Sequence, residues 1–567
     1  MKRRAFLAAF AGTGFATTLL PGVLWAQMQQ GTKVVTAEMV REAARLAGLE
    51  LTDADAQDLT ASLSSLARGA EGIDRRTLTN ASPLPIHFDP RPHGVAIPPP
   101  PREPLFRIEA PPAGRRPASI DACAFLSISE LAQLLRTRQI TSTALTGMYL
   151  GRLKKHNAQL NCVAQLTEER ALAEAGAADK EIAAGRYRGL LHGVPYAVKD
   201  IIAARGYPTR WGAKPLEAQM FDDDATVVRR LKEAGAVLVA KVTTGELAFG
   251  DQWAGGRTNN PWNPQQGSSG SSAGSASATA AGLVAFAIGS DTGGSILFPA
   301  ARCGIVGLRP TFGRVSRAGV MTAGSSLDKI GPMCRRVQDC AIVLQAIAGP
   351  DGLDLAVPEG IPVTFDATKG RYPKRIGYVP AMLAGGASAD ARANNQRALD
   401  TVKALGCTLV ELDAFPGGDL SYFIEYTERA AAFEPLVAQG LHRGVSQRTG
   451  RYLRACALVT AADYLQANRR RAVIMQDVAR RLSQVDAVMF TALTLSSVSS
   501  LNPVLSLTGH PSIAVPNGFA ANGTPTAVMF SGQLYHEGPL MALAKAYEDR
   551  GRHYLKRPPG LGASTSA

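Results

Sequence analysis

A stretch rich in glycine and serine runs directly into an apolar segment and then into a second glycine turn. Residues 265–300 read QQGSSGSSAGSASATAAGLVAFAIGSDTGGSILFPA. A flexible Gly/Ser linker has polar flanks, whereas LVAFAIG in this stretch is apolar enough to lie in a core. The adjacent glycines of SDTGGS allow successive backbone amides to converge on one point, where a developing oxyanion could bind. On these residues alone, a structural turn and a catalytic loop explain the stretch equally well.

The same stretch contains GSSAG at 270–274, which matches the nucleophile elbow G-x-S-x-G of α/β-hydrolases. That elbow follows a strand, but the preceding NNPWNPQQ is typical of a turn. The segment SASATAAGL could supply the helix that follows an elbow, which meets only half of the required context. A Ser-His-Asp hydrolase is therefore not favoured.

A base for a serine nucleophile is offered by LLHGVPYAVKD, where an apolar, β-prone run ends in Lys199. A lysine after a strand is most often a surface charge whose aliphatic stem packs against apolar residues. In a closed apolar site, desolvation disfavours the ammonium form, so a lysine there becomes a neutral amine that can take a proton. Lys199 could then replace histidine as the base.

The composition is that of an ordinary globular protein, with 46% hydrophobic and 19% charged residues among 567. The formal net charge is +14, but the basic residues are scattered, with short clusters such as NRRR at 468–471. We therefore expect a solvated basic surface and no nucleic-acid partner. The seven cysteines show no C-x-x-C spacing and the eight histidines no H-E-x-x-H, so neither a metal site nor a disulfide framework is predicted.

The chain begins with MKRRAFLAAFAGTGFATTLLPGVLWAQ, and residues 1–26 are predicted to be an export signal peptide. Arg3 and Arg4 before an apolar run are similar to a twin-arginine signal, so we expect an exported protein, periplasmic or extracellular. An uncleaved membrane anchor over 5–26 is the alternative, which Gly12, Gly14 and Pro21 disfavour. No stable membrane insertion is expected once the signal is removed.

The rest of the chain divides at a proline-rich stretch. Residues 27–81 are expected to form a short helical segment, and residues 82–118, with HFDPRPHGVAIPPPPREPLF, a linker too rich in proline for regular structure. From 119 to 556, helical periods such as SISELAQLLRTRQ alternate with β-rich runs such as GVPYAV, AVLVAKV, DAVMF and SIAVP. This alternation indicates mixed α/β structure. Residues 557–567 are predicted to be a disordered tail.

Several segments, in order along residues 121–556, resemble the landmarks of the amidase-signature family. They are TSTALTGMYLGRLKKHNAQLNCV, LLHGVPYAVKDI, TNNPWNP, GSSAGSA, GSDTGGSILFPA, CGIVGLRPTFGRVSRAGV, SLDKIGPMCRRVQD and GHPSIAVPNGF. The resemblance implies a single large α/β catalytic domain at 119–556, with a mixed central β-sheet wrapped by helices. It also implies a metal-independent hydrolase that uses no cofactor.

The resemblance further implies a Ser–Ser–Lys triad. Lys199 matches the base of the VKD motif, and Ser295 in GSDTGGS matches the nucleophile. Ser271 in GSSAGSA matches the bridging serine, because the spacing to the nucleophile excludes the earlier pair Ser268 and Ser269. The bridging hydroxyl can donate to the lysine while accepting from the nucleophile, which relays a proton from nucleophile to base.

The family pattern also implies a cis peptide bond at Gly270–Ser271 and a set of supporting groups. Ser272 and Ser275 belong to the same motif and are expected to support the triad by hydrogen bonding. Asp291, beside the glycine turn, is expected to orient backbone groups rather than to transfer protons. The predicted oxyanion hole consists of the backbone amides of Thr292, Gly293, Gly294 and Ser295.

The sequence departs from the family pattern at GGSIL, where Leu297 stands in the position of an arginine. We expect packing there in place of a polar contact behind the nucleophile. Trp211 and Trp253 are candidates for lining a substrate pocket, although aromatic residues more often belong to the core. The region 377–482 carries no shared motif, and we expect substrate choice to be made there.

The resemblance predicts an amidase that cleaves the C–N bond of a small-molecule carboxylic amide through an acyl-enzyme on Ser295, with esters and carbamates as further candidate substrates. The alternative is the glutamine-hydrolysing A-type subunit of a tRNA-dependent amidotransferase, a cytoplasmic function that the export signal disfavours. A non-catalytic scaffold is a third hypothesis, disfavoured because Lys199, Ser271 and Ser295 are all intact. The sequence leaves the oligomeric state open.

Overall fold

The computed structural model describes most of the chain after residue 34. The described ranges are 35–46, 51–60, 87–111, 117–368, 370–384, 388–415, 418–456, 459–491 and 501–561. The predicted signal peptide at 1–26 lies outside them. The chain forms two compact units, of which the smaller takes its residues from 1–85, 322–325 and 423–470, and the larger takes the rest.

The smaller unit is helical where it is described. Helix α3 (Ala37–Leu46) and the helical residues 53–60 both lie within the segment predicted to be helical, 27–81. They bury a common apolar cluster made of Val35, Met39, Val40 and Ala56. The unit also contains α15 (Glu434–Ala438) and α16 (Gln447–Cys456).

The larger unit is built on one sheet of 11 strands, with both parallel and antiparallel neighbours. In sheet order the strands are β14 (Thr408–Glu411), β13 (Arg375–Tyr378), β15 (Ala487–Thr491), β17 (Pro525–Gly532), β16 (Ser512–Phe519), β10 (Val306–Arg309), β11 (Lys329–Cys334), β9 (Phe286–Asp291), β3 (Pro195–Lys199), β4 (Val237–Val242) and β2 (Val163–Leu166). The predicted mixed central sheet is therefore confirmed.

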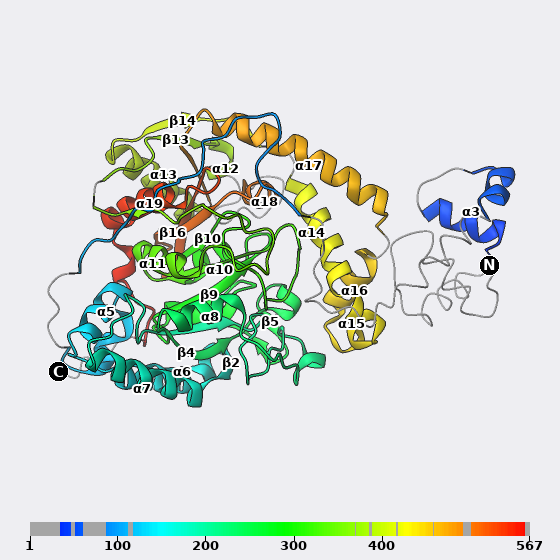
Figure 1. The fold of residues 1–567 in the computed structure, drawn as a ribbon. Coiled ribbons are helices and arrows are strands. Elements are labelled where there is room, and N and C mark those ends of the chain that lie inside the picture. The colour runs from blue at the N-terminus through cyan, green and yellow to red at the C-terminus, as the bar shows by residue number, and fades with distance from the viewer. Residues whose placement is uncertain are drawn as a thin grey trace. The chain divides into compact units, whose positions relative to one another are not determined.

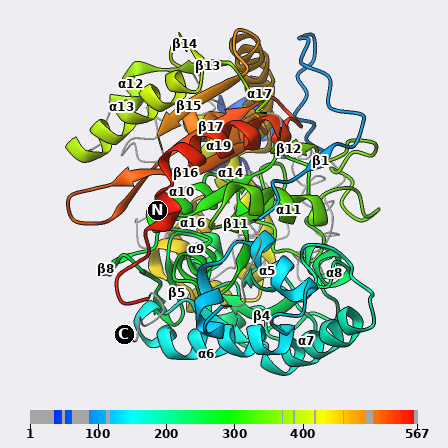
Figure 2. The ribbon, with the colours of Figure 1, turned by 90° about the vertical axis from the view of Figure 1, so that its left-hand side faces the viewer.

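Helices surround this sheet (Figures 1 and 2). They include α5 (Ile128–Arg136), α6 (Ser142–Leu160), α7 (Glu168–Ala183), α8 (Thr226–Glu233), α9 (Ala273–Ala280), α10 (Leu297–Cys303), α11 (Val337–Ile347), α13 (Ala389–Ala404), α18 (Leu501–Leu507) and α19 (Glu537–Gly551). Among the helices of the described ranges, none has the length and apolar character needed to cross a membrane.

Local sequence explains many of these elements. SISELAQLLRTRQ forms α5, where the Ser127 hydroxyl accepts from the Glu130 amide and the Glu130 carboxylate accepts from the Ser127 amide. This capping box satisfies backbone donors that a helix start leaves unpaired. AVLVAKV forms β4, GVPYAV forms β3, DAVMF forms β15 and SIAVP forms β16, as their β-rich composition predicted.

The central strands are buried along their whole length, which is why they read as continuous apolar runs rather than alternating ones. Polar residues occur where these strands end, at Lys199 on β3 and at Ser290 and Asp291 on β9. Because β3 and β9 are parallel neighbours, their carboxyl ends lie at the same edge of the sheet. The antiparallel neighbour β11 begins at that edge with Lys329, which pairs with Asp291.

The segments outside the predicted catalytic domain are partly built into the larger unit. Within the predicted linker 82–118, β1 (Phe106–Arg107) pairs in parallel with β12 (Phe365–Asp366). Within the predicted tail 557–567, Leu561 is buried, and its carbonyl accepts a hydrogen bond from Arg152.

Candidate active site

Lys199, the predicted base, ends β3 with its side chain completely buried. Its Nζ lies 2.7 Å from Ser271 Oγ and 2.8 Å from Ser290 Oγ, within hydrogen-bond distance of both. The structure thus brings the predicted base and the predicted bridging serine together. It also adds Ser290, which the sequence analysis did not single out.

Ser271 lies in the loop between β8 (Asn263–Gly267) and α9. The peptide bond Gly270–Ser271 is cis, as the resemblance implied. Residue 270 must be a glycine, because a Cβ there would lie 1.8 Å from the carbonyl oxygen of Gly250. The Ser271 carbonyl accepts from the Gly245 amide at 3.2 Å. Backbone contacts therefore hold this loop while the Ser271 hydroxyl lies against Lys199.

Ser295, the predicted nucleophile, lies between the glycine turn and α10 and is partly exposed. Its carbonyl accepts from the Ser272 amide at 3.1 Å, which joins the two serine-bearing loops. Among the described residues, no partner is found for the Ser295 hydroxyl, and no hydrogen bond joins it to Ser271. Within the described part of the chain, no hydrogen bond therefore commits this hydroxyl to another group.

Ser272 and Ser275, at the start of α9, bind the backbone of β9. The Ser272 hydroxyl donates to the Ser290 carbonyl at 3.1 Å and accepts from the Ser290 amide at 3.2 Å. The Ser275 hydroxyl donates to the Ile288 carbonyl at 3.1 Å. These two serines therefore fix α9 on β9, and they act on the triad through the backbone rather than through its hydroxyl groups.

Asp291 organises the glycine turn through its carboxylate. It accepts from the amides of Gly294 and Ile296, each at 2.8 Å, and pairs with Arg309 Nη1 at 3.3 Å. Asp291 and Arg309 are both fully buried, so each neutralises a charge that would be costly alone. Burial lowers the pKa of Arg309, an effect that the attraction of Asp291 opposes. This geometry fits the predicted orienting role of the carboxylate.

Each carbonyl group of the glycine turn is held by a hydrogen bond. The Thr292 carbonyl accepts from Ser506 Oγ, and the Gly293 carbonyl accepts from Asn502 Nδ2 at 2.8 Å. The Gly294 carbonyl accepts from the Phe298 amide at 2.9 Å. The turn is therefore a rigid loop rather than a flexible spacer, which answers the question raised by the sequence.

Not all four amides of the predicted oxyanion hole are available. The Gly294 amide donates to Asp291, so in this geometry it faces the carboxylate and not an open site. Within the described part of the chain, the amides of Thr292, Gly293 and Ser295 have no acceptor. These three amides are the ones that a bound oxygen could engage.

The polar groups beside Lys199 are strongly desolvated. Lys241 on β4 forms a buried ion pair with Asp200, Nζ to Oδ1 2.9 Å. Burial lowers the pKa of Lys241 to about 8, because desolvation outweighs the attraction of Asp200. Burial also raises the pKa of Asp200. Among the described residues, no cluster of His, Cys, Asp or Glu is arranged to hold a metal ion.

Comparison with known proteins shows which family the chain resembles. A family profile described as Amidase matches residues 144–541. The A-type subunit of the glutamyl-tRNA(Gln) amidotransferase of Thermosynechococcus vestitus is 36% identical over 480 residues, covering 76% of this chain and 99% of that protein. The crystal structure of the native peptide amidase from Stenotrophomonas maltophilia is 31% identical, with a TM-score of 0.69 over 78% of this chain and 99% of that one.

The chain belongs to the amidase-signature family. Its fold and its enzyme class, a hydrolase of amides, are those that the sequence predicted.

In this amidase Leu297 is completely buried at the start of α10, consistent with packing at a position where the family pattern has arginine. Trp211 is 4% exposed and stacks on Phe221, with ring centroids 6.2 Å apart, as expected for a core aromatic residue. Trp253, on the short strand β5 (Gln252–Trp253), is partly exposed, and its ring packs over Gly255. A role of Trp211 or Trp253 in lining a substrate pocket stays a prediction.

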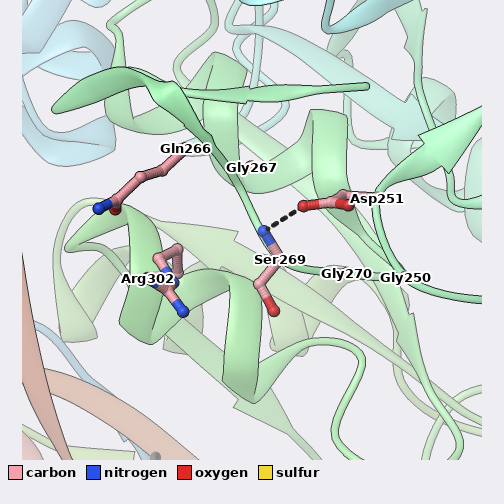
Figure 3. A pocket seen from close by; sticks show the side chains of 7 residues that line it. All are labelled: Gly250, Asp251, Gln266, Gly267, Ser269, Gly270 and Arg302. Carbon is pink, nitrogen blue, oxygen red and sulfur yellow. Dashed lines mark hydrogen bonds between the residues drawn. The ribbon is translucent and has the colours of Figure 1, made fainter. Parts of the chain in front are cut away.

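A polar pocket adjoins the loop that carries the bridging serine (Figure 3). Its lining consists of Gly250, Asp251, Gln266, Gly267, Ser269, Gly270 and Arg302. The Ser269 amide donates to the Asp251 carboxylate at 3.0 Å, while Arg302 and Gln266 lie on the other side of the pocket. The loop of Gly270 and Ser271 therefore has this polar hollow on one side and contacts the buried Lys199 through the Ser271 hydroxyl.

Sequence reasoning missed four polar residues that complete the site: Ser290, Arg309, Asn502 and Ser506. The sequence could have indicated Ser290, because it is a hydroxyl residue near the end of an apolar strand. Such a residue is expected at the same sheet edge as the polar residues that end the neighbouring strands. Arg309 of β10 lies within the quoted segment CGIVGLRPTFGRVSRAGV, but nothing in that segment indicates a contact with Asp291. Asn502 and Ser506 come from α18, far along the chain, and no local pattern marks them.

Proposed function

We propose that this amidase hydrolyses a small carboxylic amide through an acyl-enzyme on Ser295, with Ser271 and Lys199 as proton relay and base. The observation that carries the proposal is the fully buried Lys199 Nζ at 2.7 Å from Ser271 Oγ, at the sheet edge where the loop of Ser295 begins. Surface lysines do not meet serines in this way, because water solvates the ammonium group better.

The first half of the reaction follows from these groups. Burial favours the uncharged amine, which can take a proton from the Ser271 hydroxyl while that hydroxyl takes one from Ser295. The Ser295 oxygen then attacks the amide carbon, and the carbonyl oxygen becomes an oxyanion. The amides of Thr292, Gly293 and Ser295, which have no acceptor among the described residues, would be available to stabilise it, with roughly 3 kcal/mol from each donor engaged. Ser295 must turn toward Ser271 for this step, and catalytic hydrogen bonds often tighten only with substrate bound.

The second half reverses the proton path. The protonated Lys199 returns its proton through Ser271 to the leaving amine, which breaks the C–N bond and leaves the acyl group on Ser295. Water, deprotonated along the same path, then attacks the acyl-enzyme and releases the carboxylic acid. Every proton that leaves a nucleophile is returned to a leaving group, so no further reactant is needed.

A second candidate function is glutamine hydrolysis within an amidotransferase. The A-type subunits of glutamyl-tRNA(Gln) amidotransferases match this chain at 33–36% identity over nearly their full length, which favours this candidate. The same site would then release ammonia from glutamine, and partner subunits would be required. The basic net charge of +14 is compatible with it.

We also propose that the protein is exported, which separates the two candidates. The support is the sequence of residues 1–26, with Arg3 and Arg4 ahead of an apolar run. Cell fractionation should place the full-length protein outside the cytoplasm, and replacing Arg3 and Arg4 together by lysine should retain it inside. Cytoplasmic protein that copurifies with other subunits would favour the amidotransferase instead.

The substrate is tested with purified enzyme against a panel of peptide C-terminal amides, aliphatic amides, aryl acylamides, glutamine, esters and carbamates. Ser295→Ala serves as the blank. We expect turnover of at least one free amide and none by the blank. Turnover of glutamine alone would select the second candidate, and equal turnover by the blank would contradict the role of Ser295.

A further inference from the structure

A second buried lysine lies on the other side of the glycine turn. Lys329 begins β11 and is 2% exposed. Its Nζ lies 2.9 Å from Ser506 Oγ and 3.1 Å from the Ser506 carbonyl oxygen. Ser506 is on α18, and its hydroxyl donates in turn to the Thr292 carbonyl. The motifs that define the triad include neither Lys329 nor Ser506.

The direction of these hydrogen bonds is fixed by the number of hydrogens. A hydroxyl has a single hydrogen, and that of Ser506 is donated to the Thr292 carbonyl. The lysine must therefore be the donor to Ser506 Oγ. The result is a one-way chain in which Lys329 donates to Ser506 and Ser506 donates to Thr292.

The surroundings of Lys329 favour the uncharged amine. Burial holds its pKa well below the ordinary lysine value; Arg309 and Arg471 lower it further, while Asp291 and Asp328 raise it. A neutral amine has two N–H groups, and two acceptors are present, the hydroxyl and the carbonyl of Ser506. Its donors are therefore matched without a counter-ion.

The Thr292 carbonyl controls a neighbouring amide. In a trans peptide the C=O of one residue and the N–H of the next lie in one plane and point in opposite directions. The Thr292–Gly293 bond is trans, since Gly270–Ser271 is the cis bond recorded for the chain. Holding the Thr292 carbonyl therefore sets the direction of the Gly293 N–H, an amide without an acceptor among the described residues.

We propose that Lys329 is a positioning residue for the oxyanion hole, which acts through Ser506 and the Thr292 carbonyl to aim the Gly293 amide at the reacting oxygen. The inference rests on the proposed acyl-enzyme chemistry at Ser295. Thr292 has a second anchor, because its hydroxyl donates to Asp328 at 2.6 Å, but that bond holds the side chain and not the peptide plane. Loss of the lysine should therefore tilt the peptide without unfolding the loop.

The test compares Lys329→Met, Ser506→Ala and the double variant with wild type, using the best amide of the substrate panel. We expect kcat to fall roughly 10- to 100-fold in each, less than the loss of a whole oxyanion donor, with KM within about twofold. Because the two residues act as one chain, the double variant should be no slower than the worse single variant. Lys545→Met is the matched control, since Lys545 is a buried lysine on α19 paired with Glu109 and Asp549.

A transition-state analogue separates positioning from general damage. A peptide trifluoromethyl ketone forms a tetrahedral oxyanion on a serine, so its inhibition constant should rise in Lys329→Met by the same factor as kcat/KM falls. Affinity for the uncleaved amide, measured in Ser295→Ala with and without Lys329→Met, should not change. If Lys329→Met does not fold, Ser506→Ala carries the same test with the lysine in place.

Three results would overturn the inference. One is a kcat within twofold of wild type in both single variants. Another is an equal loss of affinity for the ketone and for the uncleaved amide, which indicates general damage. The third is additive loss in the double variant. These results leave the proposed function intact, whereas a wild-type enzyme that hydrolyses no amide would overturn the function itself and the inference with it.

Discussion

Two buried lysine–serine pairs flank β9, and their difference lies in the serine hydrogen. On one side Lys199 of β3 meets Ser271, whose hydroxyl hydrogen has no carbonyl acceptor among the described residues. On the other side Lys329 of β11 meets Ser506, whose hydrogen is committed to a backbone carbonyl. The first pair can move a proton, and the second can only hold a position. In the roles proposed here, the same two residue types serve as relay or as anchor, depending on what the serine faces.

The largest expected effect separates the two lysines. Lys199→Met should lower kcat by at least about 10³-fold, because no base remains to take the proton of Ser295. Its residual rate should also lose the pH dependence that the base imposes. Lys329→Met should keep the wild-type pH profile of kcat at a lower level. Identical pH profiles and identical losses in the two variants would contradict the division into relay and anchor.

Asp291→Asn should have the next largest effect, a loss of folding stability as well as of kcat. The substitution leaves Arg309 buried without its carboxylate partner, which typically costs about 3 kcal/mol or more. It also weakens the acceptor for the Gly294 and Ile296 amides, so kcat should fall at least about tenfold. Urea unfolding and steady-state kinetics measure the two effects. An unchanged unfolding midpoint would mean that Arg309 finds another partner.

The pH dependence of stability gives a smaller effect that isolates Lys329. Its folded-state pKa lies below that of the unfolded chain, so between the two values the unfolded chain binds one more proton. Wild-type stability should therefore rise with pH relative to Lys329→Met, by up to about 1.4 kcal/mol per pH unit. Urea unfolding of both proteins from pH 7 to pH 9 measures the difference. A difference that stays constant or falls with pH would mean that Lys329 is charged in the folded protein.

Ser290→Ala should have the smallest effect. It removes a hydroxyl partner of Lys199, and a single hydrogen bond contributes about 1 kcal/mol. We expect kcat to fall about fivefold with little change in the unfolding midpoint. Ser272→Ala, which loses bonds to the backbone of β9 instead, is the comparison. A loss of 10³-fold in Ser290→Ala would make Ser290 part of the relay itself.

The sequence predicted the parts of the site that sit on marked motifs. Lys199 ends an apolar run, and Ser271 and Ser295 lie in glycine-rich loops, so the family resemblance that these motifs carry predicted all three. The alternation of helical and β-rich segments predicted mixed α/β structure, and the family resemblance predicted the mixed central sheet. The close approach of Lys199 and Ser271 in the structure agrees with that reading.

The anchoring residues could not be predicted in the same way. Lys329 and Ser506 meet Thr292 only because β11 lies beside β9 in the sheet and α18 packs against the same turn. The order of the strands in the sheet differs from their order along the chain, and no local sequence pattern predicts that order. The direction of the Gly294 amide could not be predicted from the sequence either, because it depends on the orientation of single peptide planes near Asp291.

The most direct test of the acyl-enzyme account is labelling with a fluorophosphonate, followed by mass spectrometry of the digested protein. The account predicts one adduct, on Ser295, with labelling at least about 10³-fold slower in Lys199→Met and absent in Ser295→Ala. An adduct on another serine, or labelling of Lys199→Met at the wild-type rate, would contradict it.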